Sequence, residues 1–142
     1  MAPAATVDFS KSSMQESFLL TNMTPQLPGL NRQGWRYLEA YVREWAEDRD
    51  DLYVVTGALF EGEVVTIGDR VSVASGFYKI VYDPSSSDGI AFLVPHRDIK
   101  KAEIPGFIVS IDQIEEMTGF DFISAVPDEL EADIEDDIEL MW

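Results

Sequence analysis

The 142-residue sequence contains no cysteine and only one histidine, His96. Without cysteine the chain forms neither disulfides nor thiolate metal sites, so a bound metal would be a hard cation such as Mg²⁺ with oxygen ligands. Basic residues are also scarce: ten lysines and arginines stand against 27 aspartates and glutamates, for a formal net charge of −17. Surfaces that bind nucleic-acid phosphates normally carry a basic footprint, so this balance argues against a generic nucleic-acid-binding surface.

Long hydrophobic runs are absent as well. No stretch approaches the roughly 18 consecutive apolar residues that a membrane span requires, so we expect no membrane segment. The first residues form neither a charged leader nor a continuous apolar signal segment. Since 46% of the residues are hydrophobic, the chain can bury one core, and we predict one soluble domain.

The acidic residues are concentrated at the C-terminal end. Eight of them lie between residues 128 and 142, where there is no lysine or arginine, so the rest of the chain carries a formal charge of −9. We therefore predict a main domain over residues 1–127 and an acidic helix or tail over residues 128–142. The apolar residues of this tail recur at helical spacing and are Leu130, Ile134, Ile138 and Met141. They predict docking on the domain; the alternatives are a partner-binding helix, a homodimer contact or a tail that fills a basic groove.

The remaining pattern predicts an α+β fold, with an antiparallel β-sheet and helices packed against it. Apolar residues at steps of three and four predict a helix from about Asn31 to Glu47. A Pro-Ser-Gly-rich turn over residues 83–89 predicts a hairpin. Strands are expected at 18–20, 52–56, 64–67, 77–82, 90–94 and 104–109. A short helix should follow, capped by Ser110 or Asp112 and ended by Gly119.

The long predicted helix carries three polar residues that together could hold a hydrated metal beside a phosphate. Glu39 and Arg43 follow Asn31 by eight and twelve residues. At about 100° per residue, Glu39 lies roughly 80° around the helix from Asn31 and roughly 12 Å along it, and Arg43 lies one turn further. A carboxamide, a carboxylate and a guanidinium thus share one broad face, which is typical of a nuclease-like site.

Each of these residues also has a simpler interpretation. Asn31 could be a helix N-cap, and Glu39 with Arg43 could be a solvated surface pair worth a few tenths of a kcal/mol. The arginines of the helix could oppose the global negative charge locally, or could pair with glutamates of the same helix. The arginines are Arg32, Arg36 and Arg43, and the glutamates are Glu39, Glu44 and Glu47.

His96 follows an apolar strand and precedes a charged turn, in Val94-Pro95-His96-Arg97-Asp98. This context predicts an exposed loop histidine. To act as a general base it would have to reach the metal face from a different element, and we expect that it does not.

The order of the segment as a whole is more specific than any single residue. Ser17-Phe18-Leu19-Leu20-Thr21-Asn22-Met23-Thr24-Pro25-Gln26, then Leu30-Asn31, Gly34-Trp35 and Leu38-Glu39, resembles the DNA/RNA non-specific endonucleases with a ββα-metal site. Strands such as Asp51–Gly57 and Gly76–Val81 continue the likeness, which spans Met1 to about Glu131.

The resemblance implies cleavage of phosphodiester bonds in DNA and RNA with Mg²⁺. It implies that Asn31 is the direct metal ligand, that Glu39 orients metal-bound water, that Arg43 stabilises phosphate charge, and that Asn22 supports the site. In that family an Asp-Arg-Gly-His motif supplies the general base, and its usual continuation matches Ala2-Pro3-Ala4. The histidine would then lie immediately before Met1. We therefore expect the sequence to be N-terminally incomplete, with an extracellular or periplasmic location allowed.

A second interpretation is a non-catalytic binding or interaction module on a nuclease scaffold. The acidic charge, the missing base and the apolar stripe of the tail favour it. The two interpretations differ in whether an Asp-Arg-Gly-His segment is encoded in frame upstream of Met1.

Overall fold

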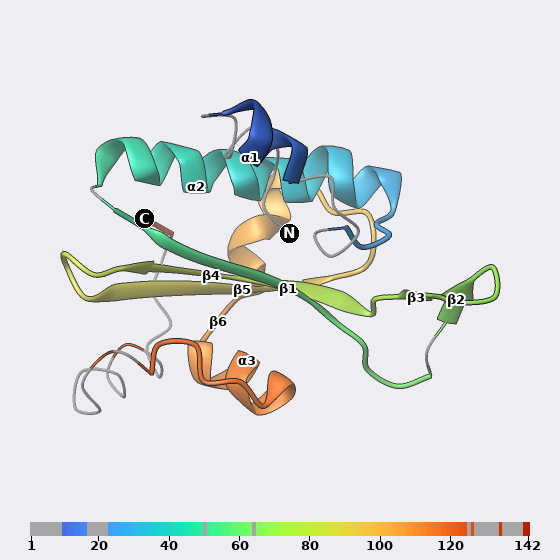
Figure 1. Ribbon diagram of the computed structural model, residues 1–142. Coiled ribbons are helices and arrows are strands. Elements are labelled where there is room, and N and C mark those ends of the chain that lie inside the picture. Colours follow the sequence, from blue (N-terminus) through green and yellow to red (C-terminus); the bar gives the residue numbers. More distant parts are fainter. Residues whose placement is uncertain are drawn as a thin grey trace.

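The computed structural model of the chain describes residues 10–16, 23–49, 51–63, 65–124, 126, 134, 141 and 142. Its centre is a four-stranded sheet with helices on both faces (Figure 1). The helical elements in chain order are α1 (Lys11–Glu16), the π-helix η2 (Leu30–Trp35), α2 (Arg36–Asp48), the 3-10 helix η3 (Lys101–Phe107) and α3 (Ile111–Thr118). The strands are β1 (Tyr53–Leu59), β2 (Val65–Ile67), β3 (Val71–Val73), β4 (Gly76–Asp83), β5 (Asp88–Pro95) and β6 (Ile108–Val109).

The four-stranded sheet has the order β1-β4-β5-β6, and every neighbouring pair is antiparallel. The predicted hairpin is confirmed: β4 pairs with β5 from Gly76 opposite Pro95 to Asp83 opposite Asp88. The predicted α+β class with an antiparallel sheet is therefore confirmed.

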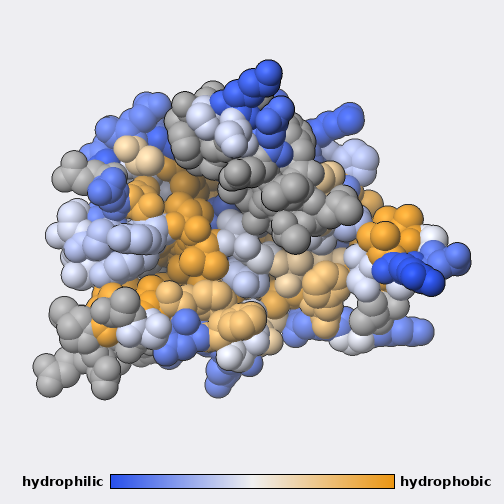
Figure 2. All heavy atoms as spheres, viewed as in Figure 1, coloured by the Kyte–Doolittle hydropathy of each residue, from blue (hydrophilic) through white to orange (hydrophobic). Residues whose placement is uncertain are grey.

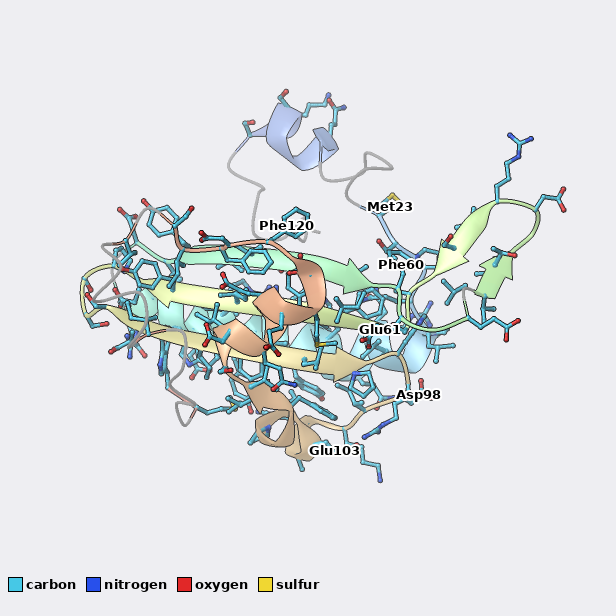
Figure 3. All side chains as sticks on the ribbon, turned by 90° about the horizontal axis from the view of Figure 1, so that it is seen from below. Met23, Phe60, Glu61, Asp98, Glu103 and Phe120 are labelled. Atoms are coloured by element: carbon cyan, nitrogen blue, oxygen red, sulfur yellow. The ribbon has the colours of Figure 1, made fainter. Side chains whose placement is uncertain are left out.

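The two faces of the sheet bury two separate clusters of side chains. Side chains alternate between the faces of a strand, so Phe77 and Val81 of β4 face the α2 side, while Tyr78 and Ile80 face the α3 side. Seen from the α3 side, α3 lies in front of the sheet (Figure 3). Lys79 falls in the alternation between Phe77 and Val81, which places this lysine on the face that α2 covers.

The predicted long helix is present, but its first turn is π-helical rather than α-helical. The apolar stripe of the predicted helix is buried against the sheet as Trp35, Leu38, Val42 and Trp45. Gly34 lies in the π turn, where a Cβ atom would overlap Cγ1 of Ile99. The glycine thus permits a close approach of η2 to the segment that follows β5.

One predicted element is wrong, and two elements, the helix α1 and the strand β3, were not predicted. Residues 104–109 do not form one strand: η3 runs to Phe107, and only Ile108 and Val109 pair with β5. The Glu103 carboxylate accepts the Lys100 backbone N–H at 2.8 Å, and Pro105 has no N–H for a sheet, so a helical turn is favoured there. The short strand β3 was not predicted, since Gly68 and its neighbours interrupt the apolar pattern.

The strands β2 and β3 form a two-stranded arm that projects from one end of the main sheet (Figure 1). Its side chains Val65, Ile67 and Val71 are at least half exposed. Hydrophobic and hydrophilic residues lie next to one another on this arm (Figure 2). Met23, Phe60 and Asp98 are found toward the same end of the molecule (Figure 3).

The short C-terminal helix is as predicted. The Ser110 hydroxyl accepts the Gln113 backbone N–H at 3.2 Å and caps α3, while Gly119 ends it with a φ of 70°. No helix among the described residues is both long and apolar enough to cross a bilayer.

Some predicted features fall outside the described residues. These include the strand over 18–20, Asn22 and most of the acidic tail. Of the tail stripe, Ile134 is buried in the cluster on the α3 side, whereas Met141 packs against the cluster on the α2 side. The two described stripe residues therefore contact opposite faces of the sheet.

Candidate functional site

Asn31 is the second residue of η2, and its side chain is exposed. Its backbone N–H donates to the Leu27 carbonyl at 2.9 Å, and its side-chain Nδ2 donates to Oε1 of Gln26 at 2.8 Å. No side-chain cap bond is present at the start of η2, where Gly29 is the N-cap. The N-cap interpretation of Asn31 is therefore wrong.

The π turn changes the expected angle between Asn31 and Glu39. A π turn closes i to i+5 bonds and so rotates less per residue than an α turn. With Asn31 inside this turn, the separation around the axis falls below the roughly 80° expected for a regular α-helix. Asn31 and Glu39 thus lie more nearly in line along η2 and α2 than the sequence predicts, and π turns are frequent at functional sites.

Glu39 is half-buried rather than a fully solvated surface residue. Burial raises the pKa of its carboxyl group, while the charges of Lys79 and Arg43 and the side-chain hydrogen bond from Trp35 oppose that rise. Trp35 can only donate, through its indole N–H, so Glu39 is the acceptor. The simple surface-pair interpretation does not account for a carboxylate held among these three groups.

Lys79 on β4 contributes a buried cation beneath the helix. The residue is 2% exposed, and Nζ donates to Oγ1 of Thr56 at 2.7 Å and lies 5.2 Å from the centre of the Trp35 ring. Burial lowers the pKa of Lys79 to about 8, although the charge of Glu39 raises it. The sequence pattern assigned Lys79 no role. The clue to it in the sequence was a single charged residue in the otherwise uncharged run of residues 76–82.

The arginines of the helix are not paired with its glutamates. Within the described part of the chain, the ion pairs join Arg49 to Asp83 and Asp88, and Arg97 to Glu103. Arg32, Arg36 and Arg43 form none of them, so the alternative interpretation, in which they pair with Glu39, Glu44 and Glu47, is wrong. Arg43 is half-buried, one turn beyond Glu39, and acts on it through charge.

His96 lies in a bend directly after β5, as predicted, but the prediction that it is exposed is wrong. The ring is half-buried and meets Phe77 edge-on, with 5.2 Å between the ring centres. Nε2 accepts the Leu27 backbone N–H at 2.9 Å, and Nδ1 lies 2.7 Å from the Ala74 carbonyl, to which it must then donate. Both nitrogens are engaged, which agrees with the expectation that His96 is not the general base.

The oxygen atoms near Asn31 suit a cation that keeps most of its water ligands, and they do not form a site built from several carboxylates. No group of three or more histidine, aspartate or glutamate side chains able to hold a metal occurs among the described residues. Mg²⁺ keeps several waters and takes few protein ligands, so one exposed carboxamide oxygen with a half-buried carboxylate further along the helix suits it. Nε2 of Gln26 is buried without a partner in the described structure, next to this carboxamide.

Comparison with protein families gives one match that covers most of the chain. The model of the DNA/RNA non-specific endonuclease family matches residues 1–129. The chain belongs to this family. Curated relatives include nuclease C1 of Cunninghamella echinulata var. echinulata, 31% identical over 86% of this chain, and a nuclease of Nostoc sp., 30% identical over 98%. Human mitochondrial endonuclease G is 28% identical over 87% of this chain.

A solved structure supports the same relationship. The chain is similar to one in the crystal structure of the EndoG/EndoGI complex, with a TM-score of 0.82 and 27% identity. This match covers 89% of the present chain and 58% of the other. The chain spans about half the length of the curated relatives, with shares of 54% for the two microbial nucleases and 46% for human endonuclease G.

Proposed function

We propose that this chain carries the metal-binding and phosphate-binding part of a nuclease that cleaves phosphodiester bonds in both DNA and RNA with Mg²⁺. Family membership supports the nuclease reaction. The observation that carries the assignment to this site is the exposed Asn31 carboxamide, which Gln26 holds on the same helical segment as the half-buried Glu39.

In this proposal Asn31 is the direct protein ligand of the cation, through Oδ1. The cation, when bound, supplies Lewis-acid stabilisation of charge on the phosphate and the leaving oxygen. Glu39 would accept hydrogen bonds from water in the site, and the indole N–H of Trp35 and the charges of Lys79 and Arg43 favour its ionised form. Arg43 stabilises negative charge that develops on the phosphate. Asn22 would support the site from the segment before Gln26.

The general base is proposed to come from a residue outside this sequence. His96 is the only histidine of the chain, and both of its ring nitrogens are occupied by backbone groups. The Asp-Arg-Gly-His segment that the family resemblance implies is the proposed source of the base. A positioned general base contributes about 10² to 10⁴-fold, so the 142 residues alone should cleave weakly or not at all.

Local charge makes phosphate binding compatible with the acidic composition. Arg32, Arg36 and Arg43 lie along one helix without ion pairs to its glutamates, and Lys79 adds a cation beneath it. We propose that residues 1–127 form the nuclease domain, and that residues 128–142 form an acidic extension docked on it. The proposal also includes two possible roles of this extension: contact between the two copies of a homodimer, or binding of a partner protein.

Supercoiled plasmid and single-stranded RNA test the proposed function. The 142-residue chain should show little Mg²⁺-dependent cleavage of either substrate. The same chain preceded by its native upstream segment, if that segment carries Asp-Arg-Gly-His, should cleave both, and EDTA should stop the reaction. Robust EDTA-sensitive cleavage by the 142 residues that survives in a His96→Ala variant would show that a different base exists. No cleavage by the folded, extended protein would favour a non-catalytic binding module.

A further inference from the structure

Among the described residues, the side-chain amide of Asn31 is hydrogen-bonded at one end only. Its Nδ2 donates to Oε1 of Gln26 at 2.8 Å. A carboxamide has one oxygen that can bind a cation and one NH₂ group that cannot. Because the bond to Gln26 engages the nitrogen, Oδ1 is left as the end available to a cation.

The side-chain oxygen of Gln26 faces Asn31, and this orientation leaves the side-chain nitrogen of Gln26 without a hydrogen bond. It is half-buried, and its Nε2 is buried with no hydrogen-bond partner in the described structure. Leaving a buried donor unpaired is unfavourable, so this orientation needs a compensating reason. If both amides were rotated by half a turn, Gln26 would donate to Oδ1 of Asn31, and Asn31 would present its NH₂ group outward instead.

The surrounding backbone fixes Gln26 and Asn31 relative to each other. Leu27, between them, donates its N–H to Nε2 of His96 and accepts the Asn31 N–H through its carbonyl. His96 is in turn bonded to the Ala74 carbonyl at the base of β4. The segment from Gln26 to Asn31 is therefore tied to the sheet, and the side-chain bond is formed within a constrained loop.

We propose that Gln26 is a positioning residue that selects Oδ1 of Asn31 as the end facing the metal. This inference rests on the proposed role of Asn31 as the metal ligand and adds the residue that sets its orientation. Gln26 touches neither metal nor substrate in this account. It acts by accepting a hydrogen bond that only the nitrogen of Asn31 can donate.

Mn²⁺ binding to the 142-residue chain, followed by electron paramagnetic resonance, tests the proposal without any cleavage reaction. Gln26→Leu keeps the side-chain size but removes the acceptor, and we expect Mn²⁺ affinity to fall by about tenfold or more, as for other residues that orient a ligand. Gln26→Glu can only accept, so it should retain the affinity. Gln33→Leu, at an exposed position of the same helical segment, is the matched control and should bind like the parent.

The Asn31→Asp variant distinguishes a loss of the Asn31 side-chain orientation from a general loosening of the loop around it. In the Asn31→Asp variant both terminal atoms of the side chain are oxygens, so either orientation presents a ligand. Adding Gln26→Leu to this variant should then have little further effect on Mn²⁺ affinity. If Gln26→Leu causes an equal loss of affinity in the parent and in the Asn31→Asp variant, the proposed orienting role is overturned.

The failure of this inference can be distinguished from failure of the proposed function. If Asn31→Ala lowers Mn²⁺ affinity but Gln26→Leu behaves like Gln33→Leu, only the role of Gln26 is overturned. If the folded parent does not bind Mn²⁺, or if Asn31→Ala binds it as well as the parent, both the metal site and the role of Gln26 are overturned.

Discussion

The ring of His96 accepts the backbone N–H of Leu27 at 2.9 Å, although 69 residues separate them in the chain. This bond ties the loop before Asn31 to the end of β5, and a second bond ties the same ring to the Ala74 carbonyl. The only histidine of the chain thus supports the loop before Asn31 through two bonds to the backbone.

His96→Ala should destabilise the fold and loosen the loop before Asn31. It removes two hydrogen bonds in a half-buried position, for an expected loss of about 2 kcal/mol in the free energy of unfolding. Urea unfolding measures this loss, and hydrogen exchange should show faster exchange of the Leu27 amide. Asp69→Ala, at an exposed position in the turn of the arm and far from this loop in the sequence, is the control. Unchanged exchange at Leu27 in His96→Ala would contradict the proposed support of the loop.

The lowered pKa of Lys79 predicts that the free energy of unfolding increases with pH in the alkaline range. Its folded pKa is lowered to about 8 from 10.5, so between these pH values the unfolded chain binds more protons than the folded chain. The free energy of unfolding should therefore increase as the pH rises from about 8 toward 10.5. The total increase should be on the order of 3 kcal/mol. Lys79→Met should lack this contribution, so the parent gains stability relative to the variant as pH rises. Parallel pH profiles, measured by urea unfolding, would contradict the lowered pKa.

Asp83 should be important for stability at the hairpin end. Its carboxylate accepts from the Ser85 hydroxyl and backbone N–H, and from Arg49 at 2.8 Å, and the Ser85 hydroxyl bond is the largest cause of its lowered pKa. Asp83→Ala should cost about 2 kcal/mol near pH 7, since hydrogen bonds to charged groups are lost.

The pH dependence of the Asp83→Ala effect tests the direction of the pKa shift of Asp83. A lowered folded pKa stabilises the protein above the unfolded value of 3.8, and this stabilisation is lost as the pH falls through the folded pKa. The difference between parent and Asp83→Ala should thus narrow below about pH 4. Asp69→Ala, exposed in the turn of the arm, should remain close to the parent throughout. A difference that does not change with pH would show that Asp83 acts only through packing.

Local patterns predicted the long helix, the hairpin and the short C-terminal helix. The helix follows from apolar residues spaced for one face, and the hairpin follows from the turn between two apolar runs. Ser110 and Gly119 marked the ends of α3, and both have the predicted roles. These features depend on residues close together in sequence, which is why the sequence was sufficient.

The features that the sequence did not predict depend on distant contacts. The π turn brings Gly34 against Ile99, and the engagement of His96 depends on Leu27 and Ala74. The position of Lys79 beneath Glu39 depends on how α2 packs across β4. The candidate residues Asn31, Glu39 and Arg43 were found from their order along one helix, but Gln26 was recognised only from its contact with Asn31.

Cleavage by the chain extended with its native upstream segment, if that segment carries Asp-Arg-Gly-His, tests whether Asn31, Glu39 and Arg43 form the active site. Asn31→Ala, Glu39→Gln and Arg43→Ala should each lower the rate of Mg²⁺-dependent plasmid cleavage, by about 10² to 10³-fold for the loss of a contact to developing charge. Gln33→Ala is the matched control on the same helical segment, and circular dichroism confirms folding of every variant. We expect large losses in all three variants and none in the control. Parent-like cleavage by all three folded variants would refute the assignment of the site.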